Sequence, residues 1–203
     1  VGEIARLYRA ERFPGLELTV VPLRNWRRSM RFDDTDLSWT KPSPNMPNLT
    51  AATLYPGIGL LEFTNLSVGR GTNLPFELVG APYITPEDLS EALASFRLPG
   101  LQFIPVRFTP ESSVFEGEPC GGVRILLKNP AKCPAVELGV VLGQTLRRLY
   151  PAQWKTQKLN TLLCHPATEQ GILALNSRTS ITSRWAEDLA AFSDRRTKHL
   201  LYE

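Results

Sequence analysis

The spacing of apolar residues along the chain predicts several helices. Residues 3–12 place Ile4, Leu7 and Tyr8 on one face, which is typical of a short amphipathic helix. Another helix has a clear start, because Thr85 suits an N-cap and the proline after it suits the first helical position. In all, the pattern predicts helices over residues 3–12, 48–55, 85–96, 135–149 and 180–192.

Four shorter runs have the length and apolar content of strands. Residues 101–108 alternate between apolar and polar, whereas the runs at 16–21 and 58–62 suit buried strands, and a fourth run covers 122–128. The proline-glycine pair at 56–57 is expected to end the helix before it. Strands and helices that alternate in this way predict an α/β (α+β) fold, a mixed β-sheet with covering helices and many loops.

Composition indicates the broad class of protein but does not indicate its function. The chain has 203 residues, a formal net charge of +3 and 42% hydrophobic residues, which indicates a folded globular chain. The small excess of positive charge does not indicate nucleic-acid binding. No run of apolar residues is long enough to span a membrane.

The few cysteines and histidines give no sign of a metal or redox site. Cys120, Cys133 and Cys164 form no CxxC pair, and His165 and His199 are far apart. One disulfide remains possible, but zinc and a Cys/His nucleophile pair are disfavoured. We expect no metal and no cofactor.

The segment from 62 to 72 is the densest in glycine and hydrogen-bonding side chains. Glycines on both sides of Arg70 allow the backbone to approach a ligand closely, and an arginine can hold a carboxylate with two hydrogen bonds. The alternative is a structural loop in which Arg70 pairs with Glu62 or Glu77. A phosphate-binding loop is the weakest interpretation, since neither GxxxxGK[ST] nor GxGxxG is present.

Two further sets of residues are candidates for chemistry. Asn45 lies between prolines on a loop with little conformational freedom, which is how a recognition group is often held. Glycosidase chemistry requires carboxylates, but none of those present forms a recognisable paired motif. The candidates are Glu62, Glu77, Glu111, Glu116 and Glu118.

Several segments together resemble one family in order along nearly the whole chain. The most specific are Pro42-Ser43-Pro44-Asn45-Met46-Pro47 and the run from Glu62 to Thr72, and others are Trp26-x-Arg28, Tyr55-Pro56-Gly57, Pro75-Phe76-Glu77, Phe108-Thr109-Pro110, Cys120-Gly121-Gly122-Val123 and Phe192-x-x-x-Arg196. The chain resembles the C-terminal half of the exo-β-N-acetylmuramidase family (NamZ type), long described as a bacterial domain of unknown function. The resemblance implies a peptidoglycan hydrolase, a glycosidase that releases N-acetylmuramic acid from the non-reducing end during cell-wall degradation or recycling.

The resemblance also implies which domain binds substrate and which carries the catalytic residue. Residues 1–203 would be the C-terminal, cleft-forming domain, and the N-terminal Rossmann-like domain with the catalytic glutamate would be absent from this chain. No residue here would then be catalytic. The partners would be a peptidoglycan-derived saccharide and the N-terminal domain of the same protein, and the location periplasmic or secreted.

Within this domain, we expect the substrate to be bound by side chains from the two most specific segments and from Glu77. They are Asn45, Glu62, Asn65, Ser67, Arg70, Thr72 and Glu77. The alternative is a non-catalytic domain that binds carbohydrate or another protein.

Overall fold

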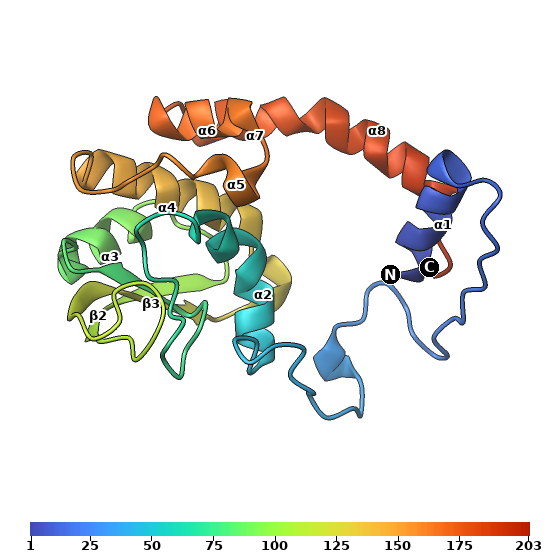
Figure 1. Cartoon of the computed structure of the whole chain (residues 1–203), viewed down its shortest axis with the longest axis horizontal. Coiled ribbons are helices and arrows are strands. Elements are labelled where there is room, and N and C mark those ends of the chain that lie inside the picture. The colour runs from blue at the N-terminus through green and yellow to red at the C-terminus, as the bar shows by residue number, and fades with distance from the viewer. The chain divides into compact units, whose positions relative to one another are not determined.

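The computed structural model describes all 203 residues and divides into two compact units (Figure 1). Unit 1 combines residues 1–38 with residues 183–203, and unit 2 is the continuous segment 39–182. The predicted α/β class is confirmed, because a small sheet is covered by helices. No helix is both long and apolar enough to cross a membrane.

Unit 2 is built on a three-stranded sheet in the order β1-β3-β2, in which both strand pairs are antiparallel. β1 spans Leu78–Ala81, β2 Leu101–Phe108 and β3 Cys120–Leu127. Val123 of the central strand faces Val79 on one side and Pro105 on the other. Pro105 is tolerated because β2 is an edge strand, where a missing N–H leaves no ladder bond unmade.

The helices of unit 2 pack around the sheet and around a central helix. This helix is α4, and it contacts α2, α3 and α6, while α3 also lies against β2 and β3. The bounds are Leu49–Ile58 for α2, Pro86–Ala94 for α3, Ala135–Leu149 for α4, Asn160–Leu163 for α5, Pro166–Leu173 for α6 and Arg178–Thr182 for α7. α2 and α4 approach closely because Gly57 has no side chain: a Cβ there would lie 1.7 Å from the carbonyl oxygen of Ala135.

Two predictions in this region are wrong. The strand expected over residues 58–62 is the end of α2 followed by a 3₁₀ turn at Gly59–Leu61. Ile58 and Leu61 are fully buried, and a continuous apolar run cannot distinguish a buried helical turn from a buried strand. Pro56 also lies inside α2 and does not end it.

Unit 1 joins the first and last parts of the chain. It contains α1 (Gly2–Arg12), a 3₁₀ turn at Phe32–Asp34, a second at Ser183–Trp185 and α8 (Ala186–Thr197). α1 packs against α8, and the guanidinium of Arg195 donates two hydrogen bonds to the carboxylate of Glu11. The single helix predicted at 180–192 is interrupted: α7 ends at Thr182, the 3₁₀ turn follows, and α8 begins at Ala186.

The C-terminal segment is fixed by residues from the start of the chain. Nη2 of Arg28 lies 2.6 Å from Oε1 of Glu3, which also accepts a hydrogen bond from the amide of Leu201. Trp26 meets Tyr202 edge to face, with ring centroids 4.7 Å apart. The strand predicted at 16–21 is wrong, since these residues belong to no sheet, and Leu16 and Val21 are exposed.

Candidate functional site

The loop over residues 62–77 leads into β1. It carries six of the seven residues expected to bind substrate, the last of which is Glu77. Its sharp course depends on Gly71, which has φ +76°. A Cβ at this position would lie 2.3 Å from the carbonyl oxygen of Ser112, and the Gly71 carbonyl accepts a hydrogen bond from the amide of Glu111 at 2.8 Å. The loop is thereby joined to the segment that follows β2.

Arg70 pairs with Glu62, which was one of the two partners left open by the sequence. Nε of Arg70 donates to Oε1 of Glu62, and the guanidinium carbon lies 5.1 Å from the centroid of the Phe76 ring. Phe76 is buried and meets Tyr55 edge to face at 4.8 Å. Arg70 is thus held on two sides, while its two terminal nitrogens have no hydrogen-bond acceptor within the chain.

Glu77 has a different environment, because its side chain is only 7% exposed. Nδ2 of Asn48 donates to Oε1 of Glu77 at 2.9 Å, and Oδ1 of Asn48 caps α2 by accepting from the amide of Ala51 at 2.8 Å. Nη2 of Arg124 lies 4.0 Å from the other carboxylate oxygen. Glu77 therefore connects the start of α2 with the sheet.

Asn65 and Ser67 make hydrogen bonds that hold the loop. The Asn65 amide donates to the carbonyl of Gln153 at 2.9 Å, and its oxygen accepts from the amide of Lys155 at 2.6 Å. Ser67 is 2% exposed, and its backbone pairs with Gly80 of β1. These contacts join the loop to the segment after α4 and to the sheet.

A groove of about 870 Å³ brings two of the predicted residues together. Asn45 and Thr72 line it, although 26 residues separate them in the chain. Glu62, Asn65, Ser67, Arg70 and Glu77 are not among its lining residues. The others that line it are Pro44, Gly71, Asn73, Leu78, Phe108, Thr109, Glu111 and Ser112.

The lining combines hydrogen-bonding groups with one aromatic ring. The side chains of Asn45 and Glu111 make no hydrogen bond within the chain, so an amide and a carboxylate are available to a ligand. Thr109 and Ser112, which carry hydroxyls, also line the groove, as does Phe108, which ends β2. Sugar rings combine hydroxyl groups with apolar faces, so this lining suits a saccharide.

The loop that continues from the groove residues Glu111 and Ser112 has unusual backbone angles. Ser113 and Phe115 both have positive φ, at 73° and 64°. Such angles cost energy in non-glycine residues and persist only where neighbouring contacts impose them. Here the amide of Gly117 donates to the carbonyl of Pro110 at 2.8 Å and closes the loop.

Sequence reasoning missed most of the groove. Glu111 was one of five candidate carboxylates, but nothing in the sequence distinguished it from the others. Phe108 and Thr109 could have been found from their position, because they lie at and just beyond the end of a predicted strand. No three His, Cys, Asp or Glu side chains gather as a metal site would require.

Comparison with known proteins gives the same family along the whole chain. Residues 53–202 match the family model of the C-terminal part of exo-β-N-acetylmuramidase NamZ, and residues 1–50 match that of its N-terminal part. The expected C-terminal assignment is therefore confirmed for residues 53–202. Unit 1 contains residues matched by both models.

Individual relatives agree with the family match. The chain is 38% identical over 205 residues to the peptidoglycan β-N-acetylmuramidase NamZ of Bacillus subtilis (strain 168), a match that covers the whole chain and 50% of that relative. Two crystal structures of DUF1343 family proteins from Bacteroides fragilis cover the whole chain with TM-scores of 0.80 and 0.74 at 26% and 27% identity. The chain spans 56% and 55% of those two proteins, so it corresponds to about half of each relative.

Proposed function

This chain belongs to the exo-β-N-acetylmuramidase NamZ family, and on that basis we propose that it is the substrate-binding half of a glycosidase that releases N-acetylmuramic acid from peptidoglycan fragments. The observation that carries the proposal is the groove of unit 2, which combines available amide, hydroxyl and carboxylate groups with the Phe108 ring. Peptidoglycan lies outside the cytoplasmic membrane, which favours a periplasmic or secreted location.

Arg70 is the second part of the proposal. N-acetylmuramic acid carries a lactyl carboxylate, and an arginine with free terminal nitrogens suits such a group. Glu62 and Phe76 hold the guanidinium in one orientation, so little side-chain entropy would be lost when a carboxylate binds. Arg70 lies next to Gly71, which lines the groove.

The catalytic acid is proposed to come from a second, N-terminal domain. This is supported by the chain's span of only half of its relative. Residues 1–50, which match the N-terminal family model, would be the part of that domain that this chain contains. The exposed apolar side chains of Leu16, Val21 and Leu23 agree with this, because they would suit a surface that a second domain covers.

The first experiment compares turnover of an aryl β-N-acetylmuramide by two proteins. One is the 203-residue chain, and the other is a chain extended upstream to the length of the Bacillus subtilis relative. We expect chromophore release only from the extended protein. Turnover by the 203 residues alone would contradict a catalytic acid in a second domain. If the extended protein is folded and binds saccharide but does not turn it over, a non-catalytic binding domain is favoured.

The second experiment tests the groove by saccharide binding to single variants. Asn45→Ala and Thr109→Ala should each weaken binding by about fivefold to tenfold, the usual effect of one lost hydrogen bond. Asn129→Ala is a matched control, because Asn129 is exposed and does not line the groove. If all three variants bind alike, the groove is not the saccharide site.

Arg70 is tested by comparing two sugars that differ in the lactyl group. The native chain should prefer N-acetylmuramic acid to N-acetylglucosamine, and Arg70→Gln should abolish that preference without unfolding the chain. If the preference is unchanged while the melting temperature falls, Arg70 only stabilises the loop.

A further inference from the structure

The saccharide groove of unit 2 has only one ionisable side chain in its lining, that of Glu111. This glutamate is exposed, and no lysine, arginine or histidine lines the groove with it. It also belongs to none of the ion pairs of the chain. The groove is therefore acidic, and nothing within the chain balances its charge.

Most of the other polar side chains of the groove are neutral groups that are free to bind a ligand. Asn45 and Asn73 carry amides, and Thr109 and Ser112 carry hydroxyls; none of the four side chains makes a hydrogen bond within the chain. Amides and hydroxyls form hydrogen bonds with the hydroxyl and N-acetyl groups of a sugar, whatever charge the sugar carries. The carboxylate of Glu111 differs, because it accepts hydrogen bonds from a neutral sugar and repels one that carries a carboxylate. Glu111 can therefore distinguish between sugars.

A group with the opposite preference adjoins the groove. Arg70 directly precedes the groove residue Gly71, and the Cα atoms of consecutive residues are only about 3.8 Å apart. Glu62 and Phe76 hold its guanidinium, whose two terminal nitrogens have no acceptor within the chain, but Arg70 does not line the groove. A group suited to a carboxylate and an acidic groove are therefore neighbours along one loop.

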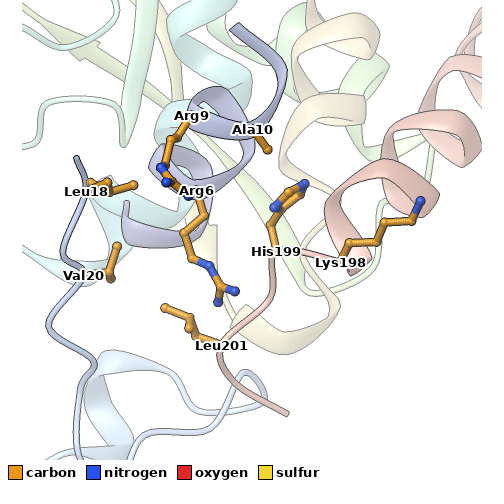
Figure 2. A pocket seen from close by; sticks show the side chains of 8 residues that line it. All are labelled: Arg6, Arg9, Ala10, Leu18, Val20, Lys198, His199 and Leu201. Atoms are coloured by element: carbon orange, nitrogen blue, oxygen red, sulfur yellow. The ribbon is translucent and has the colours of Figure 1, made fainter. Parts of the chain in front are cut away.

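The acidic lining is not general in this chain, whose formal net charge is +3. A pocket of about 600 Å³ in unit 1 has the opposite charge (Figure 2). Its ionisable lining residues are Arg6, Arg9, Lys198 and His199. That pocket adjoins the apolar segment at 16–23, which we expect a second domain to cover, so we assign no ligand to it.

Peptidoglycan alternates N-acetylmuramic acid, which carries a lactyl carboxylate, with N-acetylglucosamine, which carries no charge. We propose that the groove receives the neutral N-acetylglucosamine that follows the terminal N-acetylmuramic acid, and that Glu111 selects it. The muramic acid then lies at Arg70, and the linkage between the two sugars lies beside Gly71. This inference rests on the proposed function, and it makes Glu111 a residue that determines specificity.

The test titrates the methyl β-glycosides of the two sugars into the isotope-labelled 203-residue chain. The amide signals of Thr109 and Ser112 report on the groove, and the Nε signal of Arg70 reports on the arginine. At the groove signals the glucosaminide should bind about twofold to fivefold more tightly than the muramide, the effect of one pair of exposed like charges. At Arg70 only the muramide should give a saturable shift. Equal or tighter binding of the muramide in the groove would overturn this inference and leave the proposed function standing, whereas no binding of either sugar at any of these signals would overturn both.

A variant and a change of salt identify Glu111 as the source of the preference. Glu111→Gln keeps the size of the side chain but removes its charge, so it should raise the affinity of the groove for the muramide by about twofold to fivefold. Glu116→Gln is the matched control, because Glu116 is exposed on the same loop but does not line the groove. Added salt should reduce the preference of the native chain and leave that of Glu111→Gln unchanged, since salt screens repulsion between exposed charges. Equal effects of the two variants, or a native preference that does not change with salt, would overturn the role of Glu111.

Discussion

Asn48 and Glu77 are joined by a hydrogen bond that ties the start of α2 to the sheet. One end of the Asn48 amide donates to the buried carboxylate, and the other end caps the helix at Ala51. A residue expected to bind substrate therefore has a structural partner on each side, since Arg124 also lies near its carboxylate. Variants of Asn48 and Glu77 can therefore test whether Glu77 stabilises the fold or binds substrate.

Asn48→Ala should lower the free energy of unfolding by about 1–3 kcal/mol, because α2 loses its cap and Glu77 loses a buried donor. Asn48→Asp should be as harmful despite keeping a capping oxygen, since it places a second carboxylate against Glu77. Adding Glu77→Gln to Asn48→Asp reverses the direction of the hydrogen bond and should restore most of the loss. Urea unfolding of the three variants checks this, and an absence of rescue would show that the pair does not act through this bond.

Gly71→Ala should destabilise the chain by about 1–3 kcal/mol, because alanine at φ +76° is strained and its Cβ would meet Ser112. Saccharide affinity should fall as well, since both residues line the groove. Gly15→Ala is the matched control, because nothing lies within 4 Å of a Cβ there. Similar melting temperatures for the two variants would contradict the close approach at Gly71.

The three cysteines, none of which is in a disulfide, should differ sharply in their reactivity. Burial raises the pKa of Cys120 to about 11, whereas Cys164 is exposed. At pH 8 only about one thousandth of Cys120 would be thiolate, the form that reacts with iodoacetamide. Mass spectrometry should find Cys164 modified early and Cys120 only after denaturation, and rapid labelling of native Cys120 would contradict its burial.

Acid should loosen unit 1 through Glu3. The hydrogen bond from Arg28, aided by the Leu201 amide, holds the pKa of Glu3 below its ordinary value. A carboxyl group whose pKa is lowered by folding stabilises the fold above its unfolded pKa and loses this effect as pH falls through the folded pKa. The indole signal of Trp26, which contacts Tyr202, should report the transition by NMR. Glu3→Gln should remove this part of the pH dependence, and identical acid profiles for the two proteins would exclude Glu3 as its source.

Elements with local signals could be predicted from the sequence. The helix after Thr85 begins with a proline and two acids, and the alternation in 101–108 indicates a strand, so both appear where expected. The run at 58–62 was predicted wrongly because its apolar residues are continuous and Ile58 and Leu61 are fully buried, so no periodicity separates helix from strand. The short strand β1 was missed because its four residues are all buried.

The site was less predictable, since it depends on contacts between distant segments. From the sequence, Arg70 could pair with Glu62 or with Glu77. Only the fold shows that Arg70 binds Glu62 and that Asn48 donates a hydrogen bond to Glu77. Asn45 and Thr72 were both proposed, but nothing local indicated that they line the same groove as Glu111. Spacing along a chain does not determine distances across a loop.

The composition of unit 1 also sets the order in which the chain can fold. Its two parts are residues 1–38 and 183–203, so it cannot assemble on the ribosome until nearly the whole chain has been synthesised. Unit 2 is continuous and can form its sheet and helices earlier, while the first helix waits for α8. Contacts between such distant segments form slowly because a long loop must close first. During that interval the apolar side chains of the first 38 residues lack the partners that residues 183–203 supply, and exposed apolar surface of this kind promotes aggregation.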